Sequence, residues 1–217
     1  IYQVVEADGF NRQEVFNLFA NPFTTDRTPV QLGERQQFLL LNEAFRDETL
    51  ITDLTMEFDF DNFSLTSITS ATERSILVSR DASALTGSVS VDLGFPDEAV
   101  LLPSNLRDTT EVDQLTQEIR LSSNGDGPFQ WLVGAFYTTI EREYAQRLPT
   151  PGYDAFTDQV LGDGTSAAVA NGFGADSPFN SDLPYDLDQL ALFSELSYDF
   201  TDAFNVTVGA RYYDFEE

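Results

Sequence analysis

The chain has 217 residues and a formal net charge of −26, from 37 acidic residues and 11 arginines, with neither lysine nor histidine. This charge excludes nucleic acid as a partner, because phosphate neutralisation requires Lys and Arg. The absence of Cys and His removes disulfides and the usual ligands of zinc, copper and haem, so the sequence predicts no cofactor and no metal site of that kind.

The N-terminal part of the chain predicts one short strand, one short helix and one loop. Residues 1–6 have the apolar, β-branched character of the end of a strand. Asn11 is placed to cap a helix that runs to Phe19. Pro22, Pro29 and Gly33 interrupt residues 21–43, which we expect to form a long loop.

A first hairpin is predicted from Asp47 to Arg80. Apolar and polar residues alternate up to a tight turn at Asp61-Asn62, after which a strand rich in Ser and Thr begins at Phe63. One face of its first strand would present Leu50, Leu54, Met56, Phe58 and Phe60, and the other face Ile51, Asp53, Thr55, Glu57 and Asp59. Residues 82–110 contain Gly and Pro and show no periodicity, so we expect an irregular stretch there.

A second hairpin turns at residues 124–128. Leu115, Ile119 and Leu121 alternate with Thr116, Glu118 and Arg120 before the turn. After it, residues 129–140 are apolar on both parities between Trp131 and Tyr137, so the sequence does not assign their outer face. A polar extension follows to Arg147, and residues 148–184 are expected to be a third irregular loop.

The third hairpin, from Asp186 to Glu217, has the clearest alternation, with a break at residues 201–203. In its first arm, Ala191, Glu195, Ser197 and Asp199 share the polar parity, and Phe193 is the one large apolar exception among them. The apolar parity consists of Leu190, Leu192, Leu196, Tyr198, Phe200, Phe204, Val206, Val208, Ala210 and Tyr212. We expect these side chains to face lipid, and Glu195, Asp199 and Arg211 to face a lumen.

Short turns alternate with long loops along the chain. This connectivity is typical of an outer-membrane barrel, in which the short turns are periplasmic and the long loops extracellular. Aromatic residues lie close to each short turn, as in the aromatic girdle of such barrels. The sequence therefore predicts an all-β fold, an antiparallel transmembrane β-barrel segment of about seven strands in the bacterial outer membrane.

Three groups of residues could be interpreted as chemical sites, and each has a simpler explanation. Glu57, Asp59 and Asp61 lack the Gly and closing Glu of a calcium loop. Residues 124–127 and 162–164 look like phosphate loops, but neither has the required Lys or an evident following helix. Glu141 and Glu143 share a strand face beside Arg142 and Arg147, which favours a solvated or salt-bridged wall over an acid/base pair.

We expect no enzymatic activity, because no nucleophile-and-base constellation is present. Trp131 is interpreted as a girdle residue rather than a platform for ligand stacking. The loop acids are interpreted as solvated surface, or as charges that steer a cationic solute toward a barrel mouth: Asp97, Glu98, Asp108, Glu111, Asp154, Asp158, Asp163 and Asp176.

Two strings resemble barrel strands of TonB-dependent outer-membrane receptors. The first is Thr116-Gln-Glu-Ile-Arg-Leu leading into Trp131-Leu-Val-Gly-Ala-Phe-Tyr, and the second is Thr201-Asp-Ala-Phe followed by Gly209-Ala-Arg-Tyr. The resemblance covers residues 47–217 well. It implies a 22-stranded barrel closed by a plug domain and energised through TonB. Residues 1–217 would then be an internal part of that barrel domain, with the plug and the C-terminal strands outside this sequence.

The resemblance implies active uptake of a scarce solute such as a siderophore-iron complex, a vitamin or an oligosaccharide. The implied partners are outer-membrane lipid, TonB, the remainder of the barrel with its plug, and the cargo. The alternative is a passive porin or an adhesin-like barrel, and a more distant one is a soluble acidic β-sandwich. The sequence assigns no catalytic, cofactor, metal or ligand-binding residue.

Overall fold

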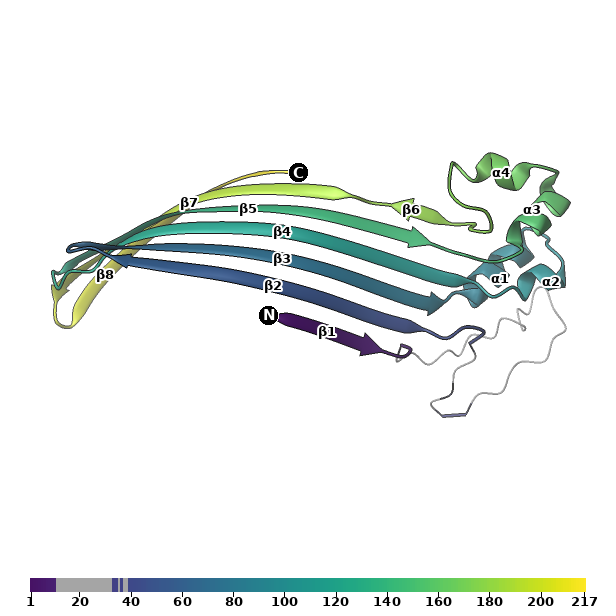
Figure 1. Cartoon of the computed structure of the whole chain (residues 1–217), viewed down its shortest axis with the longest axis horizontal. Helices are drawn as coiled ribbons and strands as arrows, with labels where there is room; N and C mark the ends of the chain where they lie inside the picture. Colours follow the sequence, from purple (N-terminus) through teal and green to yellow (C-terminus); the bar gives the residue numbers. More distant parts are fainter. Residues whose placement is uncertain (11–32, 35, 37–38) are drawn as a thin grey trace.

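The computed structural model describes residues 1–10, 33–34, 36 and 39–217. The helix expected at residues 11–19 and most of the loop expected at 21–43 lie outside these residues. The described part of the chain forms one antiparallel sheet of eight strands, in the order β1-β2-β3-β4-β5-β7-β8, with β6 paired to β5 (Figure 1).

Six of the eight strands are longer than any of the helices in the described part of the chain. Their bounds are β1 Tyr2–Ala7, β2 Ala44–Asp59, β3 Phe63–Asp81, β4 Asn105–Ser123, β5 Phe129–Arg147, β6 Asn180–Asp182, β7 Tyr185–Thr201 and β8 Phe204–Glu216. The helices are α1 Ser83–Asp92, α2 Asp97–Val100, α3 Tyr153–Leu161 and α4 Thr165–Val169. Strands of 16–19 residues in β2 to β5 exceed the ten or so needed to cross a bilayer.

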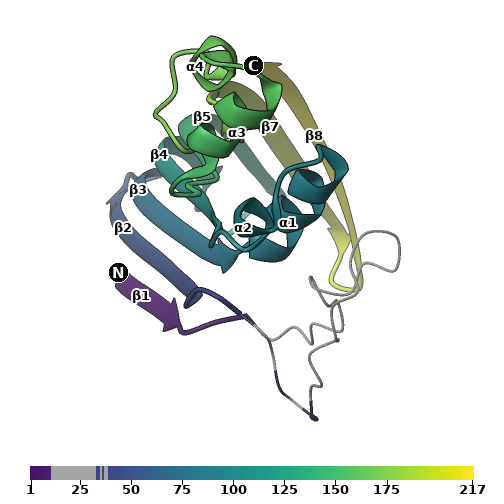
Figure 2. The ribbon, with the colours of Figure 1, turned by 90° about the vertical axis from the view of Figure 1, so that its right-hand side faces the viewer.

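The three predicted hairpins are confirmed as neighbouring antiparallel pairs β2/β3, β4/β5 and β7/β8. The sheet has eight strands rather than about seven, because Asn180–Asp182 adds a short strand beside the end of β5. It is curved and open (Figure 2). Among the described residues, β1 pairs only with β2 and β8 only with β7.

The turn at Asp61-Asn62 is confirmed as a tight hairpin connection. The Phe60 amide donates to the Phe63 carbonyl at 2.9 Å, and the two rings stack with centroids 4.7 Å apart. At the β7/β8 turn, the ring of Phe200 lies 4.8 Å from Tyr198 and 5.6 Å from Phe204. Aromatic side chains thus cluster at the short-turn end of the sheet.

The prediction that residues 82–110 and 148–184 are irregular is wrong. The first segment contains α1 and α2 and then joins β4 at Asn105, and the second contains α3, α4 and β6. In α1 the buried residues are Ser83, Thr86, Gly87 and Ser90, whereas Leu85, Val89 and Leu93 are exposed. A helix that buries small polar residues has no apolar periodicity to read from sequence. Tertiary packing supplies most of the stability of helices this short.

The helices gather at the end of the sheet opposite the short turns (Figure 1). Seen along the strands, α1, α2 and α3 lie within the arc that the strands describe (Figure 2). We call residues 82–104 and 148–184 together the loop cap.

Candidate functional site

Strand register gives the sheet two distinct faces, because directly opposed residues point to the same side. Leu192 is opposite Ala135 on β5, Ala135 is opposite Ile119 on β4, and Ile119 is opposite Ser67 on β3. We call the face that contains Leu192 the outer face and the opposite face the inner face. Trp131, Val133 and Tyr137 therefore belong to the outer face of β5, which resolves the strand that the sequence left unassigned.

The outer face is apolar toward the short turns. Exposed large apolar side chains form a belt there on β2, β4, β5, β7 and β8: Leu54, Met56, Phe58, Leu115, Ile119, Phe129, Val133, Tyr137, Leu190, Leu192, Leu196, Tyr198, Val206, Val208 and Tyr212. These include seven of the ten residues predicted to share one apolar parity in the third hairpin, all except Phe200, Phe204 and Ala210. An exposed apolar surface of this extent marks an interaction site or a membrane contact. None of the described helices is long and apolar enough to cross a membrane.

Toward the loop cap, the outer face becomes acidic. Four carboxylates oppose one another in one continuous row across four adjacent strands: Glu73 with Asp113, Asp113 with Glu141, and Glu141 with Asp186. All four residues are exposed. Like charges directly opposite each other destabilise a sheet, so this acidic row is costly unless water or counterions surround it.

The inner face is polar, with one aromatic cluster around Arg211. The guanidinium of Arg211 lies 4.9 Å from the ring of Tyr213, 5.2 Å from that of Phe193 and 5.7 Å from that of Phe136. Register confirms that Arg211 shares this face with Glu195 and Asp199, as predicted. Phe193, the apolar exception on the polar parity, is accounted for by this packing.

A second inner cluster surrounds Asp108, near the loop cap. Asp108 is buried and accepts from Arg80 Nη2 at 2.5 Å, from Gln146 Nε2 at 2.5 Å and from the Tyr144 hydroxyl at 3.3 Å. The interpretation of Asp108 as a solvated loop acid is therefore wrong, because β4 begins three residues earlier. Glu111 is likewise a strand residue, which accepts from Ser75 Oγ at 2.8 Å.

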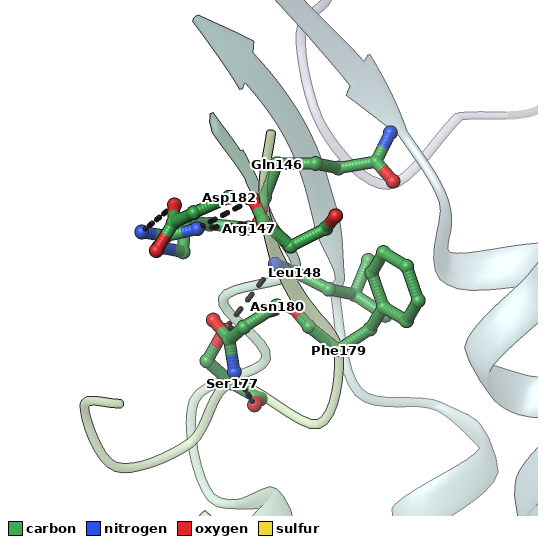
Figure 3. Close-up of polar contacts among 8 residues, drawn as sticks. Gln146, Arg147, Leu148, Ser177, Phe179, Asn180 and Asp182 are labelled. Carbon is green, nitrogen blue, oxygen red and sulfur yellow. Dashed lines mark hydrogen bonds and ion pairs between the residues drawn. The ribbon is translucent and has the colours of Figure 1, made fainter. Parts of the chain in front are cut away.

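Hydrogen bonds fix the junction between β5 and the loop cap (Figure 3). Arg147 donates to the carbonyls of Gln146 at 2.9 Å and Ser181 at 3.0 Å, and pairs with Asp182 at 2.6 Å. The Leu148 amide donates to the Phe179 carbonyl at 3.0 Å. These contacts hold the return segment before β7 against the strand that leads into the cap.

The two loops of the cap share one small core. Phe95 and Tyr153 are buried with ring centroids 5.4 Å apart, and Leu102 and Phe156 pack against them. At the base of the cap, the hydroxyls of Ser104 and Thr150 lie 2.7 Å apart and are buried. Two loops far apart in the sequence are thus a single packed unit.

Three of the loop acids have structural roles rather than being only solvated surface. Asp154 and Asp176 exchange hydrogen bonds, each carboxylate accepting from the other's amide, at 2.9 and 3.0 Å. Asp158 accepts from the Ser166 amide in the first turn of α4 at 2.8 Å. This hydrogen bond to the Ser166 backbone holds the pKa of Asp158 below its ordinary value.

The structure does not bring the other sequence candidates together as chemical sites. Glu57 and Asp59 lie on the inner face, and Asp59 accepts from Ser64 Oγ at 2.6 Å. Glu141 and Glu143 share the outer face, with no ion pair in the described part of the chain. Arg142 lies on the opposite face. No group of three or more acidic side chains suited to a metal ion occurs among the described residues.

The expectation that no helix follows residues 162–164 is wrong. Gly164, with φ of 81°, is the N-cap of α4, and Gly162, with φ of 115°, ends α3. Both angles lie in a region that favours glycine, which explains the Gly-Asp-Gly sequence. α4 has five residues and no lysine precedes it, so the segment is a helix–helix connection.

No protein-family model matches the sequence, and no curated protein matches it. The sheet resembles a solved receptor. The structure of the ferric yersiniabactin uptake receptor FyuA from Yersinia pestis superposes with a TM-score of 0.55 at 14% sequence identity. The match covers 81% of this chain and 21% of that receptor, so the chain spans about a fifth of the receptor's length.

This likeness concerns the fold alone. It identifies the architecture as an antiparallel sheet that matches a segment of the β-barrel of a TonB-dependent receptor, and the sheet is not closed. The expected fold class is therefore confirmed. Sequence reasoning missed the loop cap, the Asp108 cluster and the aromatic rings around Arg211, all of which depend on pairing between distant strands or loops.

Proposed function

We propose that this chain is part of the barrel wall of a TonB-dependent receptor that takes up a scarce solute across a bacterial outer membrane. The observation that supports this most is the division of one sheet into an apolar outer belt beside short turns and a folded loop cap at the other end. In outer-membrane barrels the apolar band is about 25 Å tall, shorter than these strands. The short turns would then be periplasmic and the loop cap extracellular.

Residues 1–217 would form an internal segment of the barrel domain. The reason is that, among the described strands, β1 and β8 each pair on one edge alone, and unpaired backbone groups in lipid cost several kcal/mol each. Further strands would pair with both edges, and a plug would occupy the space inside the arc. Lipid, TonB and a small-molecule or oligosaccharide cargo are the proposed partners.

Uptake measurements test this proposal. Cells that depend on the protein for a radiolabelled solute should lose accumulation when TonB is deleted, while binding at the cell surface persists. Accumulation that is unchanged without TonB would refute active transport.

A passive pore is the second candidate, suggested by the carboxylates of the inner face. Planar-bilayer recordings of the purified protein distinguish the two. A plugged receptor is largely silent, whereas a porin gives steady open channels. The helices that lie within the arc of the strands support the silent outcome.

A further inference from the structure

The loop cap contains a cavity of about 430 Å³, partly open to solvent, between α1, α3, α4 and residues 170–180. Its apolar lining comes from all of these segments: Val89 and Leu93, Leu161, Val169, and Phe173 and Phe179. The volume lies within the range of small-molecule sites, which are mostly apolar with a few placed polar groups. Of these lining residues, Val89 in α1 and Leu93 directly after it are also exposed at the surface of the cap.

One carboxylate contributes to this lining. Of the described residues around the cavity, Asp154 is the only acid, and none is a base. Its Oδ2 accepts from the Asp176 amide at 2.9 Å. No hydrogen bond to its Oδ1 is found in the described part of the chain, so this oxygen can accept one from a ligand.

The charges around the cavity are of one sign. Residues 82–104 and 148–184 contain no Arg or Lys and have eight acids: Asp92, Asp97, Glu98, Asp154, Asp158, Asp163, Asp176 and Asp182. Arg147, whose guanidinium lies 4.7 Å from the Phe173 ring, is already paired with Asp182 at 2.6 Å. A cleft lined by one sign of charge concentrates the opposite ion and repels its own.

We propose that the cavity binds an organic cation with an aromatic or aliphatic body, and that Asp154 pairs with its charged group. The apolar walls would hold the body, and the excess of acidic over basic residues in the loop cap would exclude anions of the same shape. As a binding station for the solute, the cavity rests on the proposed uptake function. Binding itself is measured without transport.

The test uses two probes of equal ring size and opposite charge. The complete protein, purified in a non-ionic detergent, is titrated with 1-naphthylmethylammonium and with 1-naphthylacetate by calorimetry. We expect the cation to bind at least about tenfold more tightly than the anion. Equal affinities, or binding of neither probe, would overturn the proposal.

Three variants locate the site. Asp154→Asn keeps an oxygen for the Asp176 amide but removes the charge, and should weaken cation binding about tenfold. Asp163→Asn removes the same charge from a cap residue outside the lining, and it should change the affinity for the cation less than about twofold. Val169→Trp should fill the cavity and abolish binding. Equal effects of the two Asn variants, or unchanged binding by the Trp variant, would contradict the assignment.

The two proposals fail separately. If the purified variants change cation binding as expected but uptake by cells does not need TonB, the transport function is refuted and the cavity proposal stands. TonB-dependent uptake by a protein that binds neither probe would refute only the cavity.

Discussion

Gly134 lies beneath the ring of Phe193 on the inner face. A Cβ atom at Gly134 would lie 2.3 Å from Phe193 Cζ and 2.9 Å from the Ile119 carbonyl oxygen. The ring covers the glycine and also contacts the Arg211 guanidinium, so three strands meet at this one contact. Aromatic side chains commonly cover strand glycines in this way, which compensates for the missing side chain.

Gly134→Ala should destabilise the protein by about 1–3 kcal/mol, because Phe193 must leave its position over the strand. Urea unfolding of the micelle-bound protein measures this. Gly209→Ala is the matched control, since a Cβ there would lie 3.5 Å from the Ser194 carbonyl oxygen, an ordinary contact. Phe193→Ala should remove the part of this penalty that comes from the ring, so the double variant should lose less stability than the sum of the two single variants, while the contact with the Ile119 carbonyl oxygen remains. Additive losses would contradict this.

Asp158 should make the start of α4 sensitive to acid. Its pKa is lowered in the folded protein, chiefly by the hydrogen bond from the Ser166 backbone. A lowered folded-state pKa gives stability that is present above the unfolded value and lost as pH falls through the folded one. Amide exchange at residues 165–169 should therefore accelerate as pH falls below about 4, after correction for intrinsic rates. Asp158→Asn should remove this pH dependence of amide exchange. If the pH dependence persists in the variant, another acidic residue is responsible for it.

At the scale of elements, the loop cap behaves as one unit although its two loops are separated by the β4/β5 hairpin. Phe95 from the first loop and Tyr153 from the second share the core, and the Asn105 amide donates to the Pro149 carbonyl at 3.0 Å. Helices of four to ten residues are too short to persist without such packing.

Phe95→Ala should therefore loosen both loops together, lowering the local unfolding free energy of the cap by about 3–5 kcal/mol. Limited proteolysis should show new cleavages within residues 83–100 and within 153–169 at similar rates. Leu85→Ala, at an exposed position of α1, serves as the control and should leave the pattern unchanged. Cleavage confined to the first loop would show that the loops fold independently.

At the scale of the whole molecule, the sheet separates an apolar outer belt from a polar inner wall. Leu54 and Thr55 are neighbours in β2 on opposite faces: Leu54 opposes Thr69 on the outer face, and Thr55 opposes Ile68 on the inner face. Such a pair allows one substitution to be compared across the two faces at nearly the same height.

On the outer face, which we propose contacts lipid, Leu54→Arg should impair assembly into the outer membrane, because a lipid-facing arginine costs about 2–4 kcal/mol near the bilayer centre. Thr55→Arg should be tolerated, since the inner wall is polar. Heat-modifiable mobility of the protein in membrane fractions reports assembly. The reverse order of effects would mean that the two faces are wrongly assigned.

The long-strand architecture could be predicted from the sequence because alternation is a local signal. Leu190 to Phe200 shows it without reference to any partner strand. The strand at 129–140 needed its neighbours, since both of its parities are apolar and only the pairing of Trp131 with Leu196 decides its face. The loop cap could not be predicted, because α1 buries Ser83 and Ser90 and leaves Leu85 outside. The Asp108 cluster depends on side chains from three strands.

The acidic row across Glu73, Asp113, Glu141 and Asp186 has a mechanical consequence for a sheet embedded in a bilayer. Four charges on adjacent strands cannot be drawn into hydrocarbon without a large desolvation cost. The row therefore limits how far this part of the sheet can move into the hydrocarbon. Each residue advances a strand by about 3.3 Å, so a displacement of a few residues toward the membrane would be opposed on four strands, one after another where the strands are tilted.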